Sequence, residues 1–292
     1  MRIAPTMSHR VLLALVLSAC ATWTLWARGQ AGVVFPLTPG SVRLAAIGDM
    51  GTGAAPQIDV ANQMVKARAS FPFDFVITLG DNIYIGEKPS DFEKAFAAPY
   101  RRLLDAGVLF YASLGNHDHA SEQSYAPFNM NGANYYTYTK GRVRFFVLDS
   151  NHMDAAQIAW LEVRLREAGD ADWKVCYFHH PLYSSARRHG SDVRLRKLLE
   201  PVFVKYGVDV VLAGHDHVYE RLLPQQGVSY FVEGASGQLR AGNLAPSALT
   251  AKGFDADRSF MLIEFAGDEM YFQAVSRAGA IVDAGVIHRT VR

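Results

Sequence analysis

The segment VVLAGHDHVYER, residues 210–221, joins an apolar run to a pair of histidines. Residues 210–213 are apolar, as in a buried strand, and the polar cluster begins at the glycine that follows. Because side chains alternate between the two faces of an extended backbone, His215 and His217 project from the same side, whereas on a helix they would diverge. The spacing indicates a ligand that needs two imidazoles.

Strand-like runs alternate with helix-like segments from about residue 40 onward. The strand-like runs are VRLAAI (42–47), FDFVITL (73–79), GVLFYASL (107–114), VRFFVL (143–148), WKVCYF (173–178) and VDVVLA (208–213). The helix-like segments between several of them are residues 55–69, 90–106, 154–169 and 191–206. This alternation predicts an α/β domain.

The C-terminal part of the chain has a different pattern. Its short strand-like runs are joined by turns without a long helix, and they cover residues 228–235, 259–267, 269–276 and 280–288. The sequence AGDE, residues 266–269, predicts a hairpin turn between two of them. We expect these strands to form a second, largely antiparallel sheet. Residues 40–292 would then fold as one domain, with two sheets packed face to face and helices outside.

The composition is typical of a soluble globular protein with a large core. The chain has 292 residues, half of them hydrophobic, and 29 basic side chains balance 28 acidic ones. This balance, with no run of like charges, argues against a nucleic acid polymer as the partner. We therefore expect a small molecule as the ligand.

The N-terminus predicts an export signal over residues 1–30. Arg2 and Arg10 precede an uncharged apolar stretch, residues 11–27, as in a signal peptide. The segment is expected to lie outside the fold. The protein would then be secreted, periplasmic or anchored in the envelope, and it would touch a membrane only through this segment.

Three fates of this segment remain open. The sequence LSAC, residues 17–20, resembles a bacterial lipobox, in which Cys20 would carry the lipid. Cleavage near GQAG, residues 29–32, is the competing interpretation. An uncleaved anchor comes third, because the stretch is short for a span of about 20 residues.

Polar clusters follow most of the apolar runs in the α/β part. They are GDMG (48–51), GDNIY (80–84), GNHD (115–118), HHP (179–181) and GHDH (214–217). Ligands of open α/β sheets bind at the carboxyl ends of the strands, so we expect these clusters to meet at one sheet edge. Glycine at each sharp turn would allow close approach of the backbone and a positive φ.

The residue types in these clusters predict a metal site. Carboxylates, an asparagine and several histidines without thiolate suit iron, manganese or zinc rather than a structural zinc cluster. The donors are about twice as many as one ion needs, which favours two ions. Two metal ions about 3.5 to 4 Å apart can hydrolyse phosphate esters, because a water bound between them becomes hydroxide near neutral pH. Hydrolysis is therefore the expected reaction.

The ordered motifs DMG, GDNIY, GNHD, a histidine after VCYF, and GHDH resemble those of the calcineurin-like metallophosphoesterases. Tyr84 in GDNIY makes the chain similar to the purple acid phosphatases, and specifically to their small, tartrate-resistant type, which have a tyrosinate ligand there. The resemblance runs from residue 48 to 217, and the GASG tail fits the same domain. It implies an α/β fold in which two mixed β-sheets pack face to face with helices outside, a four-layer αββα sandwich.

The resemblance also implies a ligand for each of two ions. A ferric ion would be held by Asp49, Asp81, Tyr84 and His217, and a divalent ion (iron, zinc or manganese) by Asp81, Asn116, His179 and His215. Asp81 would bridge the two. In the doublet of residues 179 and 180, alignment on the following proline favours His179 as the ligand and gives His180 no assigned role.

Two further histidines are candidates for catalysis. His117, next to the predicted ligand in GNHD, is expected to contact the phosphate or the leaving oxygen, oriented by Asp118 if their side chains meet. His189 in SSARRHGSD is the second candidate, because the family has a substrate-facing histidine at a similar distance after the fourth motif. The spacing in this chain is longer by about one residue.

The predicted function is a dinuclear-metal phosphohydrolase. An acid phosphatase that hydrolyses small phosphate monoesters, by in-line attack of a metal-bound hydroxide, is the first hypothesis. A variant that prefers diesters, pyrophosphates or nucleotides is the alternative within the same chemistry. A non-catalytic phosphate-binding surface protein is the alternative from another class, and the intact set of ligand positions argues against it.

Overall fold

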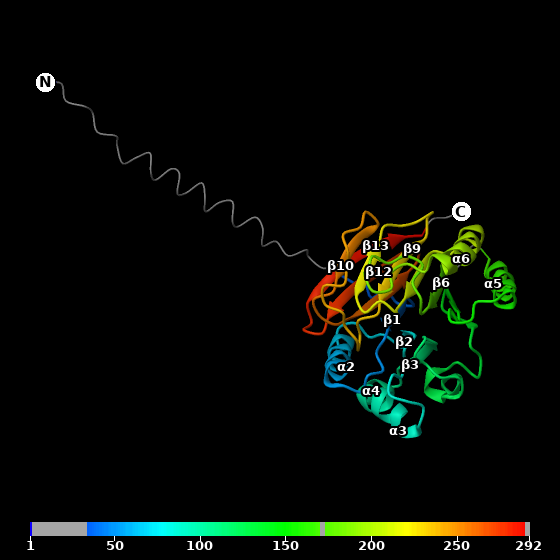
Figure 1. Ribbon diagram of the computed structural model, residues 1–292, viewed down its shortest axis with the longest axis horizontal. Coiled ribbons are helices and arrows are strands. Elements are labelled where there is room, and N and C mark those ends of the chain that lie inside the picture. The colour runs from blue at the N-terminus through cyan, green and yellow to red at the C-terminus, as the bar shows by residue number, and fades with distance from the viewer. Residues whose placement is uncertain (2–33, 170–172, 290–292) are drawn as a thin grey trace. The chain divides into compact units, whose positions relative to one another are not determined.

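The computed structural model describes Met1, residues 34–169 and residues 173–289 (Figure 1). The predicted export segment, with Cys20, lies outside the described residues apart from Met1, so its cleavage, lipidation and role in localisation stay predictions. Within the described part of the chain, none of the helices combines the length and apolar character needed to cross a bilayer.

The first sheet has six strands in the order β13-β12-β11-β1-β2-β3. Its parallel part consists of β1 (Val42–Ile47), β2 (Phe75–Leu79) and β3 (Leu109–Ser113). The strands β11 (Ser259–Ala266), β12 (Glu269–Ser276) and β13 (Ile281–His288) continue it in antiparallel pairing, with β11 next to β1. The predicted hairpin is present, because Ala266 pairs with Glu269.

The second sheet has seven strands in the order β10-β8-β9-β7-β6-β5-β4. The strands β5 (Val143–Val147), β6 (Trp173–Phe178), β7 (Val210–Ala213) and β9 (Ser229–Glu233) run parallel to one another. The strands β4 (Tyr136–Lys140), β8 (Tyr219–Leu222) and β10 (Thr250–Phe254) pair antiparallel at the two sides. Both sheets are therefore mixed.

The two sheets pack face to face through an apolar core. The rings of Phe75 on β2 and Phe145 on β5 lie 5.6 Å apart, and those of Trp173 on β6 and Phe265 on β11 lie 5.0 Å apart. Alternate residues of both sheets fill the layer between them, as the two-residue period of a strand requires. The predicted face-to-face packing of two mixed sheets is confirmed.

Helices cover the outer face of each sheet, which completes four layers (Figure 1). On the first sheet lie α2 (Ala55–Arg68), α3 (Pro89–Phe92), a π-helical turn (Glu93–Ala97) and α4 (Ala98–Asp105). On the second lie α5 (Ala155–Glu167) and α6 (Val193–Tyr206). Asp154 and Asp192 cap these two helices, each accepting a backbone N–H at 2.8 Å.

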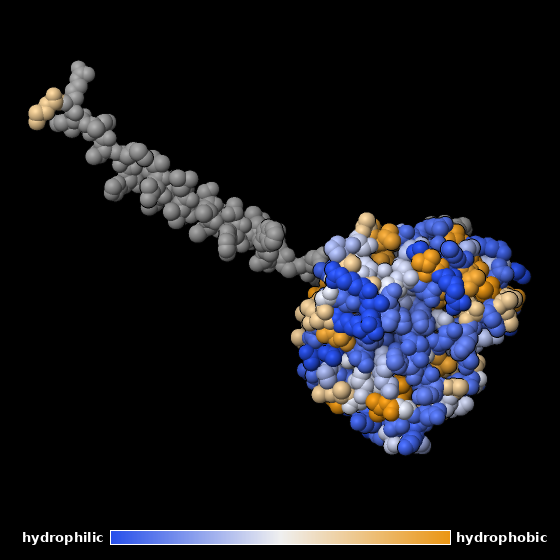
Figure 2. All heavy atoms as spheres, in the orientation of Figure 1, coloured by the Kyte–Doolittle hydropathy of each residue, from blue (hydrophilic) through white to orange (hydrophobic). Residues whose placement is uncertain are grey.

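The structure corrects one expectation about the strands. The last three strands do not form a separate antiparallel sheet but extend the sheet that β1 begins, through the β1–β11 pairing. Continuous apolar strands such as β11 are buried on both faces, and their composition cannot distinguish a parallel from an antiparallel neighbour. The face of the described residues seen in Figure 2 is mostly hydrophilic, with hydrophobic side chains in separate small groups.

Candidate metal centre

The five polar clusters come together at the ends of two sheets rather than at one sheet edge. Three of them follow β1, β2 and β3 of the first sheet, and two follow β6 and β7 of the second. Because the sheets pack face to face, the carboxyl ends of these strands are neighbours. The centre is thus built across the contact between the two layers.

Four predicted ligands form the first donor group: Asp49, Asp81, Tyr84 and His217. The Tyr84 hydroxyl lies 2.8 Å from Asp81 Oδ2 and 3.1 Å from Asp49 Oδ1, either of which can accept its proton, and it lies 3.4 Å from His217 Nε2. His217 Nε2 is also 3.2 Å from Asp49 Oδ1. Both carboxylates are buried. The Tyr84 hydroxyl is therefore close to the other three side chains, and one ligand atom from each of Asp49, Asp81 and His217 lies within 4.8 Å of the other two.

The second donor group contains Asp81, Asn116, His179 and His215. His179 Nε2 lies 3.0 Å from Asn116 Oδ1, 3.1 Å from His215 Nδ1 and 3.4 Å from Asp81 Oδ1. Asp81 therefore belongs to both groups, with Oδ2 toward Tyr84 and Oδ1 toward His179. This geometry brings together every residue that was predicted as a ligand.

The backbone around the donors is held in an uncommon conformation. Asp49, Asp81 and His215 have φ values of 53°, 52° and 68°, in the left-handed region that few non-glycine residues adopt. Such strain persists where surrounding contacts enforce it, and it clusters at functional sites. The expected positive φ is present at Gly80, where φ is 83°, and the other positive φ values of the motifs fall on these donor residues rather than on Gly48, Gly115 or Gly214.

The neighbouring glycines are needed for close approach. A Cβ on Gly115 would lie 2.2 Å from Asp81 Oδ1, and one on Gly214 would lie 2.6 Å from Asp49 Oδ2. Any side chain at either position would displace a donor carboxylate.

The protonation of His179 leaves a lone pair facing the centre. Its Nδ1 lies 2.9 Å from the Leu79 carbonyl oxygen, which can only accept, so Nδ1 carries the proton. Nε2, which faces Asn116 and His215, is then unprotonated in the neutral ring. Burial lowers the pKa of His179 to about 4 and that of His215 to about 2, which keeps both rings neutral near pH 7. Neutral imidazoles are the form that binds metal ions.

The first donor group carries an excess of negative charge. Burial and the nearby Asp81 carboxylate raise the pKa of Asp49 well above its usual range, and burial with both carboxylates raises the pKa of Tyr84. A pKa raised in this way shows that ionisation is costly without a counter-charge. Carboxylates, a phenol and imidazoles directed at common points are the donors that iron, zinc and manganese accept. The residues therefore fit a pair of metal ions.

The two predicted catalytic histidines lie on the exposed side of the centre. The ring of His117 packs 4.8 Å from the ring of Tyr84, and its backbone N–H donates to Asp81 Oδ1 at 2.9 Å. His189 packs 4.2 Å from His215. Both side chains are exposed, His117 over the first donor group and His189 over the second. The longer spacing before His189 does not keep it away from the centre.

Asp118 does not take the position expected for it. One oxygen accepts the backbone N–H groups of Asn82 and Ile83 at 2.6 and 3.1 Å, and the other accepts from Gly115 N and Asn82 Nδ2 at 2.8 and 2.7 Å. Among its described hydrogen bonds none goes to His117. Asp118 instead ties the loop after β2 to the loop after β3, and so acts on the positions of Asp81 and Asn116.

A family model described as calcineurin-like phosphoesterase matches residues 42–219. The chain belongs to the calcineurin-like phosphoesterases. The resemblance drawn from the motifs is confirmed, as is the predicted enzyme class, a phosphoric ester hydrolase. The matched region contains every residue of both donor groups.

Relatives of this phosphoesterase are named tartrate-resistant or purple acid phosphatase, the group to which the motif with Tyr84 is similar. Tartrate-resistant acid phosphatase type 5 of Oryctolagus cuniculus is 27% identical, covering 73% of this chain and 79% of the relative. Purple acid phosphatase 17 of Arabidopsis thaliana is 26% identical, covering 84% of each.

Solved structures share the fold of this phosphoesterase. Purple acid phosphatase PPD1 from yellow lupin seeds aligns with a TM-score of 0.73 at 20% identity, covering 85% of this chain and 54% of that one. GAP50, the anchor in the inner membrane complex of Plasmodium, aligns with a TM-score of 0.74 at 18% identity, covering 86% and 89%. At these identities the alignments support the fold alone.

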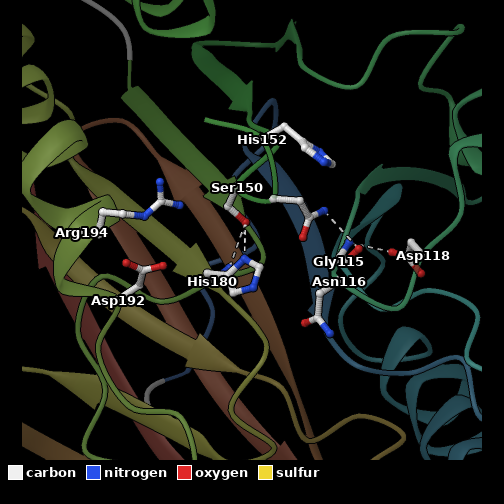
Figure 3. Close-up of a pocket in the computed structure, with 9 residues that line it drawn as sticks. Gly115, Asn116, Asp118, Ser150, His152, His180, Asp192 and Arg194 are labelled. Carbon is white, nitrogen blue, oxygen red and sulfur yellow. Dashed lines mark hydrogen bonds between the residues drawn. The ribbon is translucent and has the colours of Figure 1, made fainter. Parts of the chain in front are cut away.

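Two residues of this phosphoesterase were missed as candidates by sequence reasoning. The ring of His180 lies 4.4 Å from that of His215, and Asn116 and His180 line the same cavity beside the centre (Figure 3). Arg240 donates its backbone N–H to the His217 carbonyl, and its charge contributes to the low pKa of His217, about 4, after the larger effect of burial. The HHP motif was the sequence signal for His180. Arg240 lies in a loop that contains no motif, so the sequence offered no signal for it.

Proposed function

We propose that this phosphoesterase is an acid phosphatase of the purple type, which hydrolyses small phosphate monoesters with a ferric and a divalent ion. The observation that carries the proposal is the contact of the Tyr84 hydroxyl with two buried carboxylates and His217 within 3.4 Å. A phenol in that place suits a ferric ion, which favours anionic oxygen donors. The second donor group, with an amide oxygen and neutral imidazoles, suits a divalent ion.

The bound ions would supply positive charge for the phosphoryl oxygens and a water of lowered pKa as the nucleophile. The residues of the chain then have separate tasks. Asp81 holds the two donor groups together, because each of its oxygens faces one of them. Asp118 fixes the loops that present Asp81 and Asn116.

The exposed histidines handle the substrate. His117 is positioned by its backbone bond to Asp81, and its imidazole is free to donate a proton to the leaving oxygen. His189 lies over the second donor group, where its ring nitrogens can contact a phosphoryl oxygen. Both roles rest on placement at the open side of the centre.

The test is hydrolysis of 4-nitrophenyl phosphate by the purified protein, with its metal content and visible spectrum. We expect turnover that a chelator abolishes and that iron together with zinc restores, and a purple solution that Tyr84→Phe bleaches. Tyr135→Phe, which alters a tyrosine packed on Trp160, is the matched control. A colourless protein with two zinc ions would contradict the ferric site, and faster hydrolysis of bis(4-nitrophenyl) phosphate would favour a diesterase.

Export is the second part of the proposal and rests on residues 1–30. We expect the mature chain to begin at a lipidated Cys20 or near residue 31. Mass spectrometry of the N-terminus after expression in a bacterial host, with Cys20→Ser for comparison, distinguishes these two outcomes. A full-length chain in the cytoplasmic fraction would contradict export.

A further inference from the structure

A polar cavity of about 410 Å³ opens beside the second donor group (Figure 3). Its wall includes Asn116, Ser150, His180, Asp192 and Arg194. This volume exceeds the space that a phosphate group needs and falls in the range of small-molecule sites, about 300 to 1,000 Å³. The cavity can therefore hold the part of a substrate that lies beyond its phosphate.

Contacts with Ser150 hold the ring of His180 at the wall of the cavity. The Ser150 hydroxyl oxygen accepts the backbone N–H of His180 at 3.1 Å and lies 2.9 Å from His180 Nδ1. A hydroxyl can donate one bond and accept two, so this contact occupies Nδ1 whichever of the two atoms donates. The second ring nitrogen, Nε2, is left to contact a group in the cavity, and the ring also lies with those of His179 and His215 in one group of possible metal ligands.

Arg194 and Asp192 provide further polar groups on the far wall. In Figure 3 the guanidinium of Arg194 extends toward Ser150, and among the described residues it has no hydrogen-bond or ion-pair partner. Asp192 uses Oδ1 to cap α6, which leaves Oδ2 to accept. One cation and one carboxylate lie on the same wall, which therefore offers both hydrogen-bond donors and acceptors.

We propose that this cavity is the leaving-group subsite and that it selects phosphate monoesters of hydroxylated alcohols such as polyols or sugars. The inference rests on the proposed function, because it assigns the alcohol part of the same substrate. His180 contacts the hydroxyl nearest the phosphate through Nε2, and Asp192 and Arg194 bind the hydroxyls further away. His180, Asp192 and Arg194 are thus specificity residues.

The polarity of the wall disfavours the other classes of leaving group. An alkyl or aryl group would take water away from Arg194 and from Nε2 of His180 without replacing those hydrogen bonds. A site built to bind hydroxyl groups rejects analogues that lack them, because its polar groups stay unpaired. An anionic leaving group would meet Asp192 as well as Arg194, which removes the advantage of its charge.

Binding of two phosphonates that cannot be hydrolysed tests the inference. The probes are 3,4-dihydroxybutylphosphonate, an isostere of glycerol 3-phosphate, and butylphosphonate, which lacks both hydroxyls. Calorimetry on the metal-loaded protein should show about tenfold tighter binding of the dihydroxy compound, as two modest hydrogen bonds provide. Equal affinities, within twofold, would overturn the subsite.

Variants of the wall assign the selectivity to residues. Arg194→Met and His180→Phe should each reduce the ratio of the two affinities about threefold. Lys197→Met, at an exposed position on the same helix, is the matched control and should keep the ratio. Loss of bound metal in His180→Phe would contradict the assignment of His180 to the substrate and make it a metal ligand.

The outcome is separable from that of the proposed function. Turnover of 4-nitrophenyl phosphate without any preference between the phosphonates would defeat the subsite alone. A tenfold preference in binding without hydrolysis of any monoester would support the selectivity of the cavity and defeat the proposed phosphatase.

Discussion

The two donor groups share Asp81 and a common origin at strand ends, yet they differ in burial and charge. In the first group Asp49, Asp81 and His217 are all buried, and the oxygens of two carboxylates and a phenol face one another. In the second group Asn116 is exposed, and its donors apart from Asp81 are neutral. The first group therefore offers more negative charge to a cation, and the second is more open to solvent.

The difference follows from where each group lies in the fold. Loops after the central strands β1 and β2 supply the two carboxylates, and they are covered by the neighbouring strands and by the second sheet. Asn116 follows β3, which is the edge strand of the first sheet, so its loop has fewer neighbours. The order of the strands thus places the buried carboxylates after central strands and the exposed Asn116 after an edge strand.

Replacing Asp81, the shared residue, should have the largest effect. Asp81→Asn removes one negative charge from both groups and should lower kcat by at least about a thousandfold, together with metal content. Metal analysis and turnover of 4-nitrophenyl phosphate measure both. Asp268→Asn, in the β11–β12 turn, is a surface control. Loss of a single ion with most activity kept would show that the groups are independent.

Replacing His117, which lies over the first group, should have the next largest effect. His117→Asn keeps the backbone bond to Asp81 and removes the proton donor, so we expect kcat to fall about a hundredfold with both ions retained. The drop should be smaller for 4-nitrophenyl phosphate than for an alkyl phosphate, because nitrophenolate leaves without protonation. Full activity on both esters would refute the role of His117 as the acid.

Replacing Tyr84 should distinguish the two groups. Tyr84→Phe removes an oxygen donor from the first group only, so the visible colour should disappear while the second ion stays bound. We expect a change in kcat of about tenfold, the lower end of what a residue that tunes a metal causes. Loss of both ions would show that Tyr84 supports the whole centre through its bonds to Asp49 and Asp81.

Much of the fold and of the centre could be predicted from the sequence. Strand β1 matches the predicted run, residues 42–47, and the motif residues converge because each follows a strand directly. Strand β10, with the sequence TAKGF, was missed because only its position beside β8 makes it a strand. Which sheet β11 joins depends on pairing between segments more than 200 residues apart, and that leaves no local signal.

The same limit applies to the centre. Ligand identity depends on residue type and order, which the sequence contains. The partners of Asp118 depend on how the loops after β2 and β3 lie against each other. Because Asp118 is next to His117 in the sequence, His117 was predicted as its partner, and that prediction was wrong. His180 was left without a role for the same reason, since its ring is held by Ser150, which lies in the loop after another strand.

The smallest expected effect concerns Glu233, a buried carboxyl group near Asp49 of the first donor group. Glu233 is buried, accepts hydrogen bonds from Ser259 Oγ at 2.9 and 3.0 Å, and burial raises its pKa to about 8. The folded protein therefore keeps this proton up to about pH 8, whereas the unfolded chain releases it near 4.5. The resulting stability is fully present below pH 4.5 and is lost as the pH rises toward 8.

Glu233→Gln should remove this pH dependence. The Tm difference between variant and wild type should rise in the variant's favour by several °C from pH 5 to pH 8, because the neutral amide has no charge to bury beside Asp49. Scanning calorimetry at both pH values measures it, with Glu87→Gln at an exposed position as the control. A constant difference would mean that Glu233 is already ionised, its charge stabilised by Ser259 and the backbone. The first donor group would then tolerate one more buried anion than its pKa values indicate.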